Sequence, residues 1–163
     1  MADISPDVIL TIGSTLSYAF EATAGTRPTT GYTKIPGIVS SPDFDVAPDK
    51  IETTTFDNKV NKTYKPGLKD LGDLEFKANL SQSLFDTYYD TSTGIMDLYA
   101  DAKTTGKAMW ICFNPEGLNK SIYVPVEPQA PSIPAGSLNS AFQSTLRFTA
   151  SGDAIFAEDP TEA

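Results

Sequence analysis

Carboxylates crowd the stretch between residues 43 and 57, and clustered or paired carboxylates are the groups that bind calcium or cleave glycosidic bonds. The stretch contains Asp43, Asp45, Asp49, Glu52 and Asp57. Their spacing matches no EF-hand loop, and an acid/base pair has to converge from separated segments. We therefore interpret the stretch as a solvated acidic surface and expect no metal site.

Other reactive chemistry lacks the groups it needs. The chain has no histidine, so a serine or cysteine nucleophile has no imidazole base. The single cysteine, Cys112, lies in the apolar run "AMWICF" and is expected to be a core residue without a disulfide. The Gly-Lys pair in "DAKTTGKAM" is not preceded by the first glycine of a phosphate loop, and Ala108 stands where Ser or Thr would hold magnesium. We expect no enzyme activity and no cofactor.

Length and charge restrict the class further. The 163 residues suit a single domain spanning 1–163, with flexible segments at about 1–8 and 158–163. The formal charge of −9 opposes attraction to nucleic-acid phosphates. The N-terminus lacks a basic and a long apolar region, and no window is long enough to span a bilayer, so a soluble protein made in the cytoplasm is expected.

Strand patterns recur along the chain. "DLEFKANL" (73–80) alternates apolar and polar residues, and "AFQSTLRFTA" (141–150) does so with one break, which predicts two half-buried strands. We expect the second of these to pair with "DAIFAE" (153–158). In "AMWICF" (108–113) both alternating sets are apolar, which predicts a central strand with a sheet or helix on one face and another subunit as a candidate cover for the other. "KIETTTF" (50–56) and "SIYVPVEP" (121–128) add β signals, with Pro125 indicating an edge or interrupted strand.

One amphipathic helix is predicted near 94–103, with Thr93 as its candidate N-cap and Gly106 beyond its end. The preceding "SLFDTYYD" fits a helical turn and the end of a strand equally well. The Gly-, Thr- and Pro-rich segments 22–37 and 128–137 are expected to be long surface connections. Trp110, Tyr88, Tyr89 and Tyr99 could stack on a sugar or base, but aromatics at such spacing favour core positions.

Positive charge is concentrated in residues 58–69, which hold four of the 12 Lys and Arg residues and no acid. These are Lys59, Lys62, Lys65 and Lys69. One interpretation is a solvated basic loop. The other is a long hairpin arm near 57–72 whose charge complements an acidic patch on an identical neighbour, in head-to-tail contacts that build rings or filaments.

The segment "KIETTTFDNKVNKTYKPGLKDLGDLEFKANL" resembles the corresponding segment of major tail tube proteins of long-tailed (siphovirus-like) bacteriophages. In both, a Thr-rich strand and an Asp precede a variable loop, a Tyr and "PGLKDLGDLEF". "TLRFTASGDAIF" is similar to the closing strand and Ser-Gly turn of that family, so the resemblance covers most of residues 32–157. From the short C-terminus we expect no added immunoglobulin-like domain.

The resemblance implies a mainly β fold, a β-sandwich or partly closed barrel with one flanking helix. It also implies a structural virion protein without catalytic or cofactor sites, whose six copies form rings that stack into a hollow tube. The subunit-interface loop would comprise Lys59, Lys62, Tyr64, Lys65, Pro66, Gly67, Leu68, Lys69 and Asp70. Carboxylates that face the lumen would repel DNA passing through at ejection, and the candidates are Asp43, Asp45, Asp73 and Glu75.

The implied partners are further copies of the chain and the tape-measure, tail-tip and tail-terminator proteins, in a phage tail assembled from protein made in the host cytoplasm. Two alternatives stay open. One is a tube component of a contractile injection system, which shares the architecture. The other is a monomeric sugar-binding or adhesive β-sandwich, which the aromatics and long loops would suit.

Overall fold

A computed structural model describes residues 12–44, 48–57, 59–67 and 70–160, and every structural statement below refers to these residues. The expected flexible segment 1–8 and the last residues of 158–163 lie largely outside them, as do Asp45, Leu68 and Lys69. The strands are β1 Thr15–Phe20, β2 Thr33–Lys34, β3 Ile38–Ser40, β4 Lys50–Glu52, β5 Tyr64–Pro66, β6 Asp73–Asn79, β7 Met109–Asn114, β8 Lys120–Pro128, β9 Gln143–Ala150 and β10 Ile155–Glu158. The helices are α1 Gln82–Tyr89 and α2 Ile95–Thr104.

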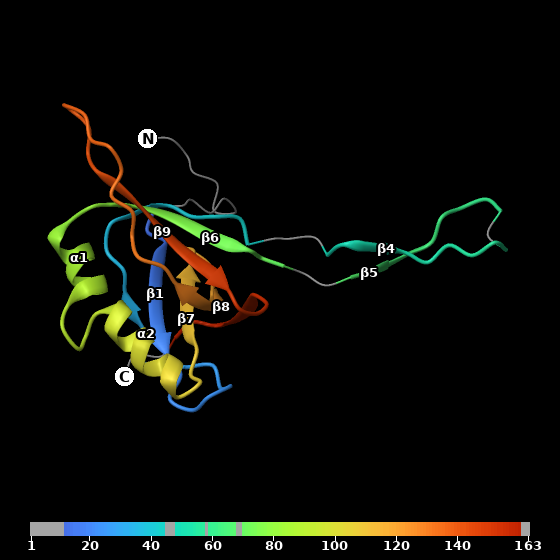
Figure 1. Ribbon diagram of the computed structural model, residues 1–163, viewed down its shortest axis with the longest axis horizontal. Coiled ribbons are helices and arrows are strands. Elements are labelled where there is room, and N and C mark those ends of the chain that lie inside the picture. The colour runs from blue at the N-terminus through green and yellow to red at the C-terminus, as the bar shows by residue number, and fades with distance from the viewer. Residues whose placement is uncertain (1–11, 45–47, 58, 68–69, 161–163) are drawn as a thin grey trace.

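Eight of the described strands form one antiparallel sheet in the order β2-β1-β7-β8-β9-β6-β3, with β10 also paired to β8. The sheet curls into a half-barrel, and α1 and α2 lie to one side of it (Figure 1). The predicted mainly β fold class is therefore confirmed.

The predicted alternation in β6 is confirmed: Leu74, Phe76 and Ala78 are buried while the residues between them are exposed. β6 pairs along its whole length with β9, so that Phe76 lies opposite Leu146 and Leu74 opposite Phe148. These side chains join residues of β1, β7 and β8 in the main core. Two faces that alternate in the same register produce one continuous apolar layer.

The helices cover the core side of this layer. Ser81 caps α1 by accepting a 3.2 Å hydrogen bond from the backbone N–H of Leu84, which makes "SLFDTYYD" a helix. The described residues thus form two helices where one was predicted. α2 begins one residue later than predicted, and its N-cap is Gly94 rather than Thr93, whose hydroxyl donates to Asp90 instead.

β8 changes its partner midway. Lys120–Tyr123 pairs with β10, whereas Val126–Pro128 pairs with β9. Pro125 lies at this change, and its carbonyl accepts a 2.9 Å hydrogen bond from the N–H of Ser151. The strand is therefore interrupted on one edge, as the proline indicated, but the expected pairing of the 153–158 segment with β9 is wrong.

β7 is the predicted central strand, between β1 and β8, and both of its faces are covered. Trp110, Cys112 and Tyr123 form a second cluster on the outer face. The chain itself covers this face, because the Arg27 guanidinium lies 4.3 Å from the ring centroid of Tyr123 and Tyr32 packs edge-on at 5.6 Å. Another subunit is not needed there, and the buried Cys112 is a core residue as predicted.

β4 and β5 form a separate two-stranded sheet with Lys50 opposite Pro66 and Glu52 opposite Tyr64. This hairpin arm, residues 48–57 and 59–67, extends far from the half-barrel at one end of the molecule (Figure 1). The arm predicted near 57–72 therefore exists, but it begins earlier and includes the predicted strand 50–56, of which only Lys50–Glu52 is strand.

Candidate assembly surfaces

The hairpin arm exposes apolar side chains. Phe56 is 106% exposed and Val60 is 89% exposed, and Ile51 and Tyr64 are about half exposed or more. An isolated two-stranded hairpin is marginally stable in water, because it has no apolar layer to bury. An arm that carries exposed apolar groups away from the body is a surface suited to contact with another chain.

The lysines of the predicted interface loop are exposed on the arm. Lys59, Lys62 and Lys65 all face solvent, and the Lys62 ammonium lies 3.9 Å from a carboxylate oxygen of Glu52. That pair is exposed on both sides and contributes little to the stability of the arm. The positive charge therefore remains available to a partner.

The other described loop residues form the second limb of the arm and its base. Tyr64, Lys65 and Pro66 are β5, and the N–H of Gly67 donates to the carbonyl of Asp49 across the hairpin. Asp70 lies at the base, where its carboxylate accepts a 2.8 Å hydrogen bond from the N–H of Gly72. The loop that the sequence picked out is thus one side of a longer two-sided structure.

Asp73 and Glu75 lie together on the exposed face of β6, but this face is not uniformly acidic. The Arg147 Nε on β9 donates a 2.7 Å hydrogen bond to Glu75, and the Thr149 hydroxyl donates one of the same length to Asp73. Lys77 shares the face. Two carboxylates are therefore balanced by two cations. Asp43 is exposed on a different segment, the one that follows β3.

A further apolar surface surrounds the outer side of α1. Phe85 and Tyr89 project from α1 with their ring centroids 4.9 Å apart. With Leu80, Leu84, Pro131, Ser132 and Ile133 they line a recess of about 100 Å³. This surface was not predicted from the sequence. Phe85 and Tyr89 stand four residues apart, and each directly follows a buried residue, Leu84 or Tyr88. Two such pairs indicate a helix with apolar groups on two sides.

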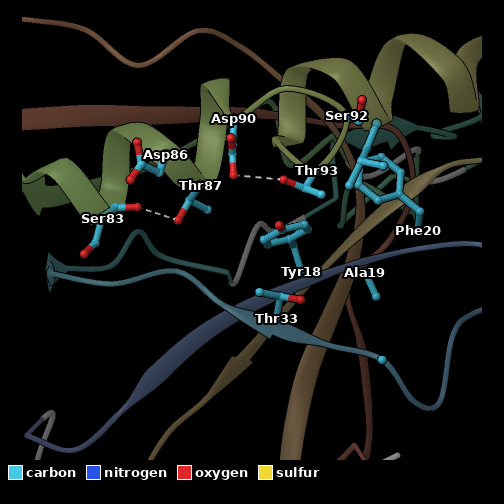
Figure 2. Close-up of a pocket in the computed structure, with 12 residues that line it drawn as sticks. Tyr18, Ala19, Phe20, Thr33, Ser83, Asp86, Thr87, Asp90, Ser92 and Thr93 are labelled. Carbon is cyan, nitrogen blue, oxygen red and sulfur yellow. Dashed lines mark hydrogen bonds between the residues drawn. The ribbon is translucent and has the colours of Figure 1, made fainter.

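On the opposite side of α1 lies an open hollow of about 500 Å³ with a mixed polar and apolar lining (Figure 2). Asp86 on α1 and Asp90 and Thr93 in the turn between α1 and α2 form one wall, and Tyr18 and Thr33 lie across from them. The Thr93 hydroxyl donates to Asp90 at 3.1 Å, and Thr87 donates to the Ser83 carbonyl at 2.8 Å. Among the described lining residues of the hollow there is no Lys, Arg or Cys, and the charged groups are the carboxylates of Asp86 and Asp90.

The remaining candidates are metal ligands, stacking aromatic residues and membrane-spanning helices. The described residues contain no cluster of acids and cysteine that could hold a metal ion. Trp110 and Tyr88 are buried, as predicted for core aromatics, whereas Tyr89 is about half exposed beside the recess. None of the described helices has the length and apolar character needed to cross a membrane.

No protein-family model and no curated protein matches the chain. Its fold is nevertheless similar to chains in solved structures. A chain from the baseplate of the anti-feeding prophage is 9% identical with a TM-score of 0.56, over 97% of this chain and 98% of that one. A chain from the sheath–tube complex of PVC, an extracellular contractile injection system, in the extended state is 15% identical with a TM-score of 0.56, over 93% of each chain.

A chain from the sheath/tube terminator of the same system is 16% identical with a TM-score of 0.57, over 92% of this chain and 96% of that one. Identities this low show a common fold and nothing more. The likeness extends over nearly the full length of each chain, so it concerns the whole half-barrel and its helices.

Proposed function

We propose that this chain is a structural subunit of a tail-type tube, which self-assembles into closed rings that stack around a lumen. The observation that carries the proposal is the hairpin arm, which holds exposed apolar groups and three exposed lysines away from a body whose fold is similar to chains of tube-bearing assemblies. A monomer that works alone has no use for such an arm, because its apolar surface costs solubility.

The arm and the body suit head-to-tail contacts. The arm lies at one end of the molecule and the helices at the other (Figure 1), so a contact between them joins different surfaces of two copies. Heterologous contacts close into rings when the rotation between copies allows it and otherwise give open filaments. The resemblance implies stacked rings of six copies. In such a tube the contacts within a ring would close, and the contacts between rings would continue along the tube axis.

The finer assignment combines two sources of support. The segment that ends in "PGLKDLGDLEF" resembles major tail tube proteins of long-tailed phages, which supports a tube through which DNA passes, together with tape-measure, tail-tip and terminator partners. The fold likeness to chains of contractile injection systems supports the second candidate, a tube inside a sheath. In both candidates the subunit forms part of the wall of a tube.

In either tube, the exposed face of β6 and β9 is our proposed lumen surface. It carries the polar side chains of Asp73, Glu75, Arg147 and Thr149 and no large apolar side chain. Its balanced charge offers a passing polyanion neither a strong attraction nor a strong barrier, which revises the expectation of a uniformly repulsive acidic lining.

Negative-stain electron microscopy of the purified chain over a concentration series, with light scattering on the same samples, tests the proposal. Rings or hollow tubes of uniform diameter are the expected result. Monomers at every concentration would contradict it and would favour the monomeric binding module that the sequence left open.

A further inference from the structure

The recess beside α1 is shaped for a side chain rather than for a small ligand. Its volume of about 100 Å³ is well below the roughly 300–1,000 Å³ of typical small-molecule sites. Its lining is almost entirely apolar and includes Leu84, Phe85 and Ile133. Ile133 is 69% exposed, so an apolar side chain stands at the open edge of the recess.

The charged residues of α1 and of the neighbouring segments in the sequence are all acidic. Residues 78–102 contain Asp86, Asp90, Asp97 and Asp101 and no Lys or Arg, and residues 128–146 contain no charged residue. Asp86 lies on α1 on the side away from the recess, where it faces the hollow of Figure 2. α1 therefore has an apolar recess on one side and carboxylates on the other.

The arm carries the complementary groups. Residues 59–67 contain three lysines and no acid, and they also contain the exposed Val60 and Tyr64. An apolar side chain with cations beside it complements a helix that has an apolar recess on one side and carboxylates on the other. Such complementarity determines the partner and the register of the contact as well as its attraction.

The arm cannot reach the recess of its own chain. β4 and β5 lie at one end of the molecule, while α1 and the 129–142 connection lie at the other (Figure 1). The two surfaces can therefore meet only when two copies follow one another head to tail.

We propose that the arm of one copy docks on α1 of the next, with Val60 or Phe56 in the recess and Lys59 and Lys62 beside Asp86 and Asp90. This inference rests on the proposed self-assembly and adds the identity of the receiving surface. The arm gains the apolar partner that a two-stranded hairpin lacks in water. The recess is filled by a second copy of the chain.

Mixing two one-sided variants tests the inference. The arm variant is Phe56→Asp with Val60→Asp, and the recess variant is Phe85→Asp with Ile133→Asp; all four side chains are exposed, and circular dichroism checks that both variants fold. Each variant alone is expected to stay monomeric. An equal mixture is expected to give discrete heterodimers, because only one intact arm and one intact recess remain in each pair.

The matched control is Phe156→Asp, a substitution on β10 that is 66% exposed and belongs to neither surface. It is expected to assemble as the parent chain does. A recess variant that also assembles like the parent would overturn the inference while leaving tube assembly intact.

Photo-crosslinking separates the two proposals further. A benzophenone side chain at position 60 of the full-length chain, mixed with isotope-labelled parent protein, is expected to crosslink between copies to peptides within 80–93 or 129–142. Rings or tubes whose crosslinks go elsewhere would overturn the docking site alone. Monomers without any crosslink between copies would overturn both the docking site and the proposed function.

Discussion

The indole Nε1 of Trp110 donates a 2.8 Å hydrogen bond to the carboxylate of Glu21, which lies 89 positions earlier in the chain. The other carboxylate oxygen accepts from the N–H of Gly25 at 2.9 Å and from the N–H of Ala108 at 3.1 Å. This nearly fully buried carboxylate therefore holds β7 to the loop that covers the outer cluster. It connects the second, smaller core to the central strand.

Glu21→Gln is expected to lower the free energy of unfolding at pH 7 by about 2 kcal/mol, because an amide nitrogen cannot accept the bonds that a carboxylate oxygen accepts, and hydrogen bonds to charged groups are each worth roughly 1.5–3 kcal/mol. Burial opposes the charge, but the bonds from Trp110, Ala108 and Gly25 outweigh it and lower the pKa of Glu21 below its ordinary value of 4.5. Urea titrations of both proteins measure the difference.

The pH dependence has a definite sign. A lowered pKa in the folded state stabilises the fold fully above the ordinary pKa, and this contribution is lost as the pH falls through the folded value. The difference between parent and Glu21→Gln should therefore be largest at pH 7 and shrink in acid. Glu116→Gln, at an exposed position, is the control. A difference that stays constant down to pH 3 would contradict the ionic role.

The alternation of buried and exposed residues within one strand could be predicted from the sequence, because successive side chains of a strand lie on opposite faces and Leu74 and Phe76 therefore share the buried one. Pairing between distant strands could not. The bond from Arg147 to Glu75 depends on a register between residues 72 positions apart. β10 pairs with the part of β8 that precedes Pro125, whereas β9 pairs with the part that follows it. The short α1 was left open, since eight residues with apolar groups on two sides satisfy more than one period.

The strand pairing within the arm could not be predicted from the sequence either. Its strands Lys50–Glu52 and Tyr64–Pro66 are exposed on both faces, so no buried side fixes their register in the sequence pattern. The lysine density of 58–69 located the arm, but only the pairing of its two limbs shows that the strand before the loop belongs to it. The α1 recess went unnoticed because it is formed by two segments more than 40 positions apart.

Two buried tyrosine hydroxyls make a matched pair for a stability test. Among the described residues, the Tyr88 hydroxyl is buried without a hydrogen-bond partner, whereas the Tyr123 hydroxyl donates to the carbonyl of Glu158 at 2.6 Å. Burying an unsatisfied polar group costs about 1–3 kcal/mol. Tyr88→Phe should therefore raise the unfolding free energy by about 1 kcal/mol, and Tyr123→Phe should lower it by a similar amount. Equal effects of the two substitutions in urea titrations would contradict this assignment.

Charge reversal on the arm should block assembly without unfolding the subunit. Lys59, Lys62 and Lys65 are exposed, so their joint change to Glu should leave the far-ultraviolet circular dichroism unchanged. Opposing like charges at a docking surface slow encounter and weaken binding, and we expect the concentration needed for assembly to rise about tenfold or more. Light scattering measures that concentration, and the parent chain should show the same trend, more weakly, as salt is added.

A charge-restoring partner provides the control for that experiment. Asp86 is exposed on α1 and accepts a 2.7 Å hydrogen bond from Gln82 of the same helix, so Asp86→Lys should fold normally. Mixing Asp86→Lys with the triple Glu variant should recover part of the association that each lacks alone. Recovery with a lysine placed at Phe156 instead would show that the effect is one of net charge.

The face that carries Glu75 can be located in an assembled tube by thiol labelling. Glu75→Cys should be tolerated, because the lost pair with Arg147 is about half exposed on both sides and contributes no more than about 1 kcal/mol. The native Cys112 is buried and should give no background. If the polar face of β6 lines the lumen, tubes of this variant should react with a small maleimide but not with one attached to a large polymer, while unassembled subunits react with both. Labelling of intact tubes by the polymer reagent would put Glu75 on the outer wall.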